Sequence, residues 1–135
     1  MSDKVFLDAN VLFSAAYAPG SDIAGLWQLS SVRLCTSRYA VEEARRNLDN
    51  AEERHRLDQM LGPMAEENEL APLPGHIALP AKDRPILQAA IQARATHLLT
   101  GDLRHFGALM GIRVGGVLIL QPADYLAGHA PDQSS

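Results

Sequence analysis

A chain of 135 residues with 47% hydrophobic and 21% charged residues has the size and composition of one globular domain with a buried core. Its formal net charge of −4 argues against a protein that coats nucleic acid through bulk positive charge. No apolar run approaches the roughly 20 residues that span a bilayer, and the polar start shows no signal-peptide pattern, so we expect no membrane partner and a cytoplasmic location.

The first third of the chain predicts two strands separated by two helices. Val5–Leu7 are apolar without interruption, as in a strand covered on both faces, and residues 10–18 continue at helical spacing until Pro19-Gly20. Residues 21–31 open with a Ser/Asp cap and carry an amphipathic helical pattern. Residues 32–36 predict the second short strand.

The middle of the chain predicts two helices around a loop. Residues 37–61 have the pattern of one long helix, which Gly62-Pro63 breaks or kinks. Residues 71–80 have the composition of a loop. Residues 82–95 predict a helix with Pro85 in its first turn, where a proline is tolerated.

The last third alternates strands and helices again. Residues 96–100 predict a strand, residues 102–111 a short helix, and residues 115–128 a buried strand followed by a terminal helix. The sequence contains no linker or internal repeat. We therefore expect one domain over residues 1–128 and a flexible tail over residues 129–135.

Strands that alternate with helices predict a parallel, doubly wound α/β sheet. In such sheets, ligands bind outside the carboxyl ends of the strands. Asp8 directly follows the first apolar strand, and Asp102 follows the strand at 96–100 after a glycine. Two acids at this edge of the sheet indicate a binding site.

Each of these aspartates also has an ordinary structural explanation. Asp8 is placed to cap the helix that starts at Asn10, and Asp102 is placed as a turn residue after Gly101. Either arrangement alone is common. Two of them at the same edge of one sheet favour a functional site over coincidence.

A third aspartate, Asp83, precedes the helix predicted at residues 82–95. Ile86 and Leu87 lie three and four residues after it and begin the apolar stripe of that helix. A residue shares a helix face with those three and four positions further on, so Asp83 points along the buried stripe. A simple N-cap is the alternative.

The long helix predicted at 37–61 carries two adjacent acids, Glu42 and Glu43. Glu43 lies nearer the apolar stripe than Glu42, so helical periodicity favours Glu43 as a site residue. The alternative is that both are solvated surface charges. The stripe consists of Ala40, Val41, Ala44 and Leu48.

Four carboxylates in one cleft would repel one another at neutral pH, and bound hard cations relieve that repulsion. Mg²⁺ and Mn²⁺ prefer carboxylate oxygens and water, so one or two of these ions are the expected cofactor. The five histidines show no zinc-ligand spacing, and the chain has no P-loop, dinucleotide fingerprint or G-x-S-x-G elbow.

Four segments resemble the PIN-domain nucleases, especially the VapC-like toxins of prokaryotic toxin–antitoxin pairs. The third segment is the most specific, because it combines D-x-P, a helix, a strand and T-G-D in the family's order. The resemblance implies a three-layer α/β/α fold with a central, mainly parallel sheet. The segments span nearly the whole chain and are VFLDANVLFSA, TSRYAVEEARRNL, KDRPILQAAIQARATHLLTGDLRHF and VLILQPADYLA.

Carried over residue by residue, the resemblance implies an endoribonuclease in which metal-activated water cleaves RNA. The family glutamate usually precedes a leucine by five places, which Glu43 and Leu48 satisfy. Asn10 and Thr100 match small polar positions that support the aspartates of the first and last strand ends. The catalytic and metal-binding quartet is Asp8, Glu43, Asp83 and Asp102.

The same resemblance implies an RNA substrate, a cognate antitoxin protein and a homodimer as partners. Several basic side chains are candidates for contact with the RNA backbone, and ordinary surface charge is the alternative for each of them. They are Arg38, Arg45, Lys82, Arg104 and His105.

Other functions stay open at this point. An RNA-processing nuclease without an antitoxin fits the same residues, as does a non-catalytic nucleic-acid-binding or scaffold domain. A phosphoacceptor domain would also place an aspartate at a strand end, but it needs a lysine late in the chain, and the last one here is Lys82.

Overall fold

The computed structural model of the protein describes residues 2–62 and 64–129. Within these residues the centre is a six-stranded sheet in the order β3-β2-β1-β4-β6-β5. Neighbouring strands are parallel except β5, which is antiparallel to β6. The expected α/β fold with a mainly parallel sheet is therefore confirmed. The strands are β1 Asp3–Leu7, β2 Val32–Ser37, β3 Ala65–Glu67, β4 His97–Leu99, β5 Arg113–Val114 and β6 Val117–Leu120.

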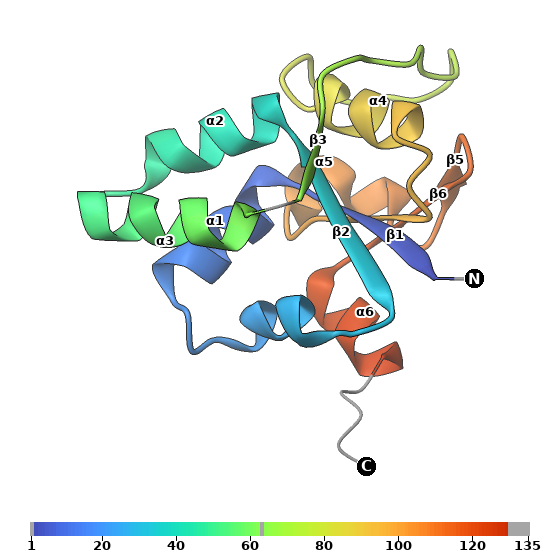
Figure 1. Cartoon of the computed structure of the whole chain (residues 1–135). Coiled ribbons are helices and arrows are strands. Elements are labelled where there is room, and N and C mark those ends of the chain that lie inside the picture. The colour runs from blue at the N-terminus through green and yellow to red at the C-terminus, as the bar shows by residue number, and fades with distance from the viewer. Residues whose placement is uncertain (1, 63, 130–135) are drawn as a thin grey trace.

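Helices cover both faces of the sheet, which gives the expected three layers (Figure 1). Helix α4 packs on β2, β3 and β4, while the 3-10 helix η1 packs with α6 beyond the opposite face. Helix α1 packs with α2 and α3. The helices are α1 Ala9–Tyr17, η1 Asp22–Gln28, α2 Arg38–Asn47, α3 Ala51–Leu61, α4 Arg84–Gln92, α5 Leu103–Phe106, the 3-10 helix η2 Gly107–Leu109 and α6 Pro122–Gly128.

The two central strands form the middle of the hydrophobic core. Val5–Leu7 of β1 and Leu98 and Leu99 of β4 have no exposed surface. Burial of a leucine or phenylalanine side chain contributes about 1.5–3 kcal/mol each, so this pair of strands is held firmly. Leu7 pairs with Leu99, and the two strands therefore end level with each other.

The helix expected over residues 37–61 is in fact two helices, α2 and α3, with a break at Leu48–Asn50. The Asn50 side chain accepts a hydrogen bond of 2.8 Å from the backbone N–H of Glu53, and the Glu53 carboxylate accepts one of 2.9 Å from the N–H of Asp49. These reciprocal bonds are a helix start signal that outweighs the continuous helical pattern. Pro63, which was expected to break the helix, lies outside the described residues.

The amphipathic helix predicted over residues 21–31 is shorter and is the 3-10 helix η1, Asp22–Gln28. The apolar residues Ile23, Leu26 and Leu29, the last of which caps the helix end, recur at intervals of three, and side chains three apart lie on one side of a 3-10 helix. The hydroxyl of Ser21, the expected cap, makes no capping hydrogen bond.

Two short edge strands, β3 and β5, were not predicted. Strand β5 forms a hairpin with β6 through Gly115 and Gly116, whose φ values of 56° and 88° suit the tight two-residue turns that join antiparallel strands. The helix expected over residues 82–95 is shorter at both ends, as α4, and the loop at residues 71–80 is irregular as expected. The tail segment 130–135 lies outside the described residues.

No helix among residues 2–62 and 64–129 is long and apolar enough to cross a membrane.

Candidate metal centre

The candidate centre lies where the strand order of the sheet reverses. From β1 the chain continues outward through β2 and β3, whereas β4 and β6 extend the sheet on the other side of β1. Ligands of open α/β sheets bind at such a switch point. Asp8 follows the last residue of β1, and its N–H donates a 3.1 Å hydrogen bond to the carbonyl of Leu99 in β4.

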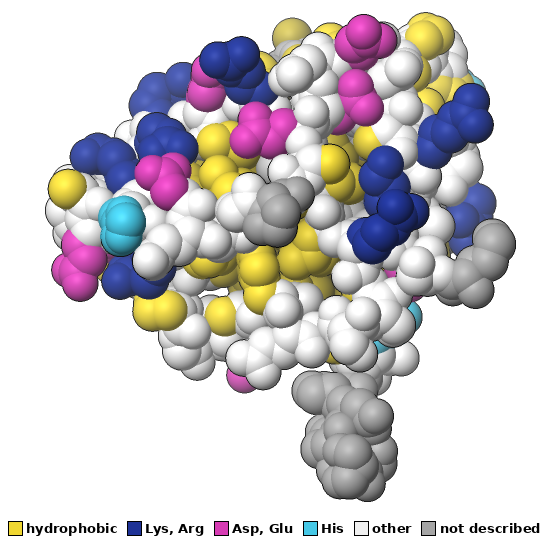
Figure 2. All heavy atoms as spheres, in the orientation of Figure 1, with side chains coloured by type: hydrophobic (Ala, Val, Ile, Leu, Met, Phe, Trp, Pro, Cys, Tyr) yellow, Lys and Arg dark blue, Asp and Glu magenta, His cyan; other side chains and the backbone are white. Residues whose placement is uncertain are grey.

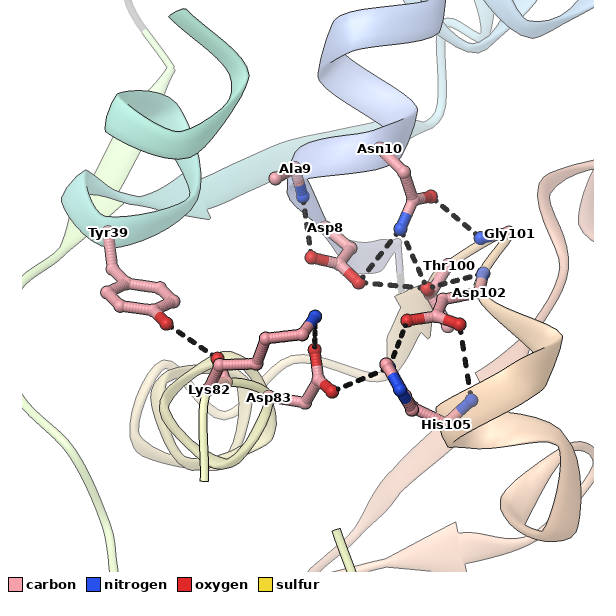
Figure 3. Close-up of polar contacts among 10 residues, drawn as sticks. All are labelled: Asp8, Ala9, Asn10, Tyr39, Lys82, Asp83, Thr100, Gly101, Asp102 and His105. Atoms are coloured by element: carbon pink, nitrogen blue, oxygen red, sulfur yellow. Dashed lines mark hydrogen bonds and ion pairs between the residues drawn. The ribbon is translucent and has the colours of Figure 1, made fainter. Parts of the chain in front are cut away.

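Asp8 is both a helix cap and a site residue, because its two oxygens have different partners. One oxygen accepts a 2.6 Å hydrogen bond from the N–H of Ala9 and caps α1. The other accepts hydrogen bonds from the Thr100 hydroxyl at 2.8 Å and the Asn10 amide at 3.1 Å (Figure 3). The capping role is therefore confirmed, and it leaves the second oxygen facing the cleft.

Asn10 and Thr100 tie the ends of β1 and β4 to each other. The Asn10 amide donates to the Thr100 hydroxyl at 3.2 Å, and the Asn10 amide oxygen accepts the N–H of Gly101 at 2.8 Å. The Thr100 hydroxyl also accepts the N–H of Asp102 at 3.1 Å. A Cβ on Gly101 would lie 3.3 Å from the Asn10 oxygen, so a larger residue here would push the Asn10 side chain aside by a few tenths of an ångström.

Burial raises the pKa of Asp8 to about 6. The hydrogen bonds from Thr100 and Ala9 oppose this rise, and the charges of Glu43 and Asp83 add to it. Only 4% of Asp8 is exposed, so its charge loses hydration that no basic group replaces. A bound cation would stabilise the ionised form.

Asp83 enters the site from the start of α4. Its backbone is already in the α-helical region, and its side chain makes no capping bond, so it is not a simple N-cap. One carboxylate oxygen lies 3.3 Å from Nζ of Lys82, and the other lies 2.9 Å from Nδ1 of His105. Asp83 is only 6% exposed, as its position beside the buried Ile86 and Leu87 predicts.

Asp102 caps the short helix α5 with one oxygen and faces the cluster with the other. The first accepts the N–H of His105 at 3.2 Å, and the second lies 2.8 Å from Nδ1 of the same residue. The three side chains of Asp83, Asp102 and His105 each contribute one potential ligand atom, and these atoms lie within 4.8 Å of one another. Figure 3 shows the imidazole between the two carboxylates.

One oxygen of this cluster lacks a hydrogen-bond donor. The Nδ1 of His105 is well aligned with Asp102 but not with Asp83, although both oxygens lie within 3 Å of it. The Oδ2 atom of Asp83 is therefore buried without a hydrogen bond. Buried oxygens are rarely left in this state, and a cation is an ordinary partner for one.

Glu43 joins the aspartates in a cleft of about 750 Å³. Its neighbour Glu42 does not line this cleft and instead forms an exposed ion pair of 3.5 Å with Arg38. The helix α2 is oriented by its buried residues Ala40, Val41 and Ala44, which turn Glu43 inward. The cleft is lined by the four predicted acids Asp8, Glu43, Asp83 and Asp102 and by a fifth acid, Asp22, which the sequence does not predict. The rest of the lining is largely apolar, with Val11, Phe13, Ile23, Pro122 and Leu126.

The basic residues expected at the RNA backbone occupy different surroundings. Arg38 and Arg45 pair with acids on the surface, and Arg104 is exposed. Figure 2 shows basic and acidic side chains interspersed over α2 and α3 on this face. Lys82 borders the acidic cluster, while His105 lies inside it rather than on the outer surface. The sequence interpretation did not find this position of His105, although its spacing of three residues from Asp102 is a signal for contact within one helical turn.

Neither a scan against protein-family models nor a search of curated proteins gives a match. The chemistry of the centre is therefore argued from its own side chains.

The residues present fit a divalent cation. Five carboxylates line one cleft, Lys82 pairs with Asp83 alone among them, and a buried oxygen of Asp83 lacks a donor within the described residues. Carboxylate oxygens are the preferred ligands of Mg²⁺ and Mn²⁺. Asp83 and Asp102 are the best placed to hold such an ion, with Asp8 and Glu43 on the same cleft wall.

Proposed function

We propose that the protein is a divalent-metal-dependent endoribonuclease. The observation that carries this proposal is the meeting of Asp8, Glu43, Asp83 and Asp102 in one cleft at the switch point of the sheet. Phosphodiester cleavage requires stabilisation of negative charge on the phosphate, which a cation held by carboxylates supplies. The resemblance of the sequence to PIN-domain nucleases supports RNA as the substrate.

In this proposal, the side chains of the centre hold metal ions and orient the groups around them. Asp83 and Asp102 would hold a Mg²⁺ or Mn²⁺ ion, and Asp8 and Glu43 would hold a second ion or a water ligand. When bound, such an ion acts as a Lewis acid and lowers the pKa of water. Asn10 and Thr100 fix the Asp8 carboxylate through hydrogen bonds.

Lys82 has a separate part in this proposal. Its ammonium lies 3.3 Å from Asp83 and its side chain is 59% exposed at the rim of the acidic cluster. A phosphate that enters the cleft would meet this positive charge before it meets the carboxylates. Lys82 would therefore help to bind the RNA backbone, as phosphate contacts position a nucleic acid without reading its sequence.

The biological setting proposed is that of a toxin with a cognate antitoxin, and it rests on the sequence resemblance alone. Co-purification with the product of a neighbouring small gene would test it, and a nuclease that is not inhibited by any such product would favour RNA processing instead.

The products of RNA cleavage test the proposed chemistry. Catalysis through the RNA 2′-hydroxyl commonly relies on two histidines, and His105 is the only histidine that contacts the four acids within the described residues. We therefore expect cleavage of an oligoribonucleotide with Mn²⁺ or Mg²⁺, 5′-phosphate and 3′-hydroxyl ends, and complete inhibition by EDTA. Cyclic 2′,3′-phosphate ends with EDTA-resistant cleavage would refute the mechanism.

Two adjacent glutamates provide a matched pair of variants. Glu43→Gln removes a carboxylate from the cleft, and we expect cleavage to fall about a hundredfold or more. Glu42→Gln loses only an exposed ion pair, which is worth less than about 1 kcal/mol, so its activity should stay near that of the parent. The opposite ranking would show that α2 presents a different acid to the substrate.

A further inference from the structure

The position of His105 carries a second conclusion about the metal. Its Nδ1 lies 2.8 Å from an oxygen of Asp102 and 2.9 Å from an oxygen of Asp83. Asp83 and Asp102 come from different elements, the start of α4 and the start of α5, so the fold brings the three groups together. The backbone N–H of His105 also donates to the Asp102 carboxylate, which holds this residue close to Asp102.

A count of hydrogens shows that hydrogen bonding does not satisfy this cluster. A ring nitrogen carries at most one hydrogen, in any tautomer or charge state. Nδ1 therefore satisfies one of its two carboxylate contacts and faces the other without a hydrogen. The oxygen left over is Oδ2 of Asp83, which is buried and has no other donor.

A cation shared by the three atoms removes this conflict. Two ligand atoms that lie about 2.1 Å from one ion and at right angles are about 3 Å apart, which is close to both N···O distances in the cluster. With its proton on Nε2, a neutral imidazole presents the lone pair of Nδ1 to an ion, as metal-bound histidines do.

We propose that His105 is a nitrogen ligand of the metal centre, together with Asp83 and Asp102, and that the centre selects a first-row transition ion such as Mn²⁺ over Mg²⁺. This inference rests on the metal site of the proposed function but not on RNA cleavage. Mg²⁺ favours carboxylate and water oxygens, whereas imidazole favours transition ions. A centre that adds one imidazole to its carboxylates therefore prefers Mn²⁺ over Mg²⁺ more strongly than carboxylates alone would.

Pulsed electron paramagnetic resonance of the Mn²⁺-loaded protein tests the ligand directly. We expect a nitrogen coupling that changes from the ¹⁴N to the ¹⁵N pattern when the protein is made with ¹⁵N-labelled histidine. Bound Mn²⁺ without a histidine coupling would overturn the inference, as would a failure of the folded protein to bind Mn²⁺. A clear coupling in a protein that does not cleave RNA would support the inference and refute the proposed nuclease function.

Substitution of the imidazole assigns the coupling to one residue. His105→Asp converts the centre to oxygen ligands, so the nitrogen coupling should disappear and the ratio of Mn²⁺ to Mg²⁺ affinity should fall about tenfold, measured by calorimetry. His55→Asn, at an exposed position on α3, is the matched control and should change neither. A coupling that persists in His105→Asp would refute the assignment, and the labelled parent protein gives its result even if this variant does not fold.

Discussion

The two ends of strands β1 and β4 carry the same types of side chain in opposite electrostatic arrangements. At the beginning of the strands, Asp3 accepts a 2.6 Å hydrogen bond from the Tyr125 hydroxyl and lies 3.3 Å from Nε2 of His129 and 3.8 Å from Nδ1 of His97. At the other end, several carboxylates share one cleft. The region at the start of the strands surrounds one acid with potential hydrogen-bond donors, whereas the region at their end contains several acids close together.

This difference separates a structural cluster from the cluster that we propose to be functional. The contacts of Asp3 link the start of β1 to helix α6, and the rings of Tyr125 and His129 stack with centroids 4.0 Å apart. An acid satisfied in this way has little left to offer a ligand. The acids beyond the carboxyl ends instead include a buried oxygen without a donor and repel one another, which lowers the stability of the protein, and a bound cation would relieve that repulsion.

The rate of RNA cleavage should show the largest contrast between variants at the two ends of strands β1 and β4. Asp102→Asn removes a charge from the proposed ligand set, and we expect the RNA-cleavage rate to fall several hundredfold or more. Asp3→Asn keeps an oxygen for the Tyr125 hydroxyl and lies outside the cleft, so its rate should change less than twofold. Equal losses in the two variants, measured on folded protein, would contradict the division between a functional and a structural cluster.

The rise in Tm on addition of Mn²⁺ should show the second-largest contrast between variants at the two ends of the strands. An ion that binds only the folded state at a hundred times its Kd adds about 2.7 kcal/mol, or roughly 5–10 °C in Tm for a domain of this size. Asp83→Asn should abolish that rise in thermal denaturation, because it removes the charge from the buried carboxylate oxygen of the cluster that lacks a donor. The rise should persist in Asp3→Asn, and an unchanged rise in Asp83→Asn would place the ion elsewhere.

Much of this architecture can be predicted from short stretches of sequence. The apolar residues of β1 and β4 mark central strands, because only strands covered on both faces are apolar throughout. Asp8 follows β1 directly and Asp102 follows β4 after two residues, so their place at neighbouring strand ends follows from the parallel topology. The periodicity of α2 likewise points Glu43 rather than Glu42 toward the cleft.

The features that the sequence does not predict depend on competing local hydrogen bonds, on very short elements or on tertiary contacts. The helical pattern of residues 37–61 is continuous, and the Asn50 cap that divides it competes with that pattern at the level of single hydrogen bonds. Strand β5 has only two residues, too few for a periodic signal. The contact of His105 with Asp83 joins two different helices, so no local spacing indicates it.

The pH dependence of stability should reveal the buried charge of Asp8. Its folded pKa of about 6 exceeds the usual value near 3.9 of an unfolded chain, so the folded state holds its proton more tightly. The metal-free protein should therefore lose stability as the pH rises from about 4 to 6. Above pH 6 the buried charge lowers the free energy of unfolding by up to about 3 kcal/mol, which corresponds to a pKa difference of two units between the folded and unfolded states.

Asp8→Asn removes that charge but loses part of the hydrogen bonding, so we expect a net gain of about 1–2 kcal/mol in the free energy of unfolding at pH 7. The gain should vanish near pH 4, where the parent carboxyl is protonated. Urea denaturation in EDTA measures both values. A gain that is independent of pH would show that the charge of Asp8 is not its source.

Tyr125→Phe should give the smallest effect and define the structural cluster alone. The substitution removes the hydroxyl that donates to Asp3 but keeps the ring that packs against His97 and His129. Because the Asp3 side chain is 28% exposed, water can replace part of the lost bond, and we expect a decrease of about 1 kcal/mol in the free energy of unfolding by urea denaturation. The exposed Tyr17 provides the control Tyr17→Phe, which should change stability little. Helix α6 also borders the cleft through Leu126. If Tyr125→Phe lost the rise in Tm with Mn²⁺, the two ends of the sheet would be coupled. An unchanged rise would support the view that the acid at the start of β1 stabilises the fold and that the acids at its end bind the metal.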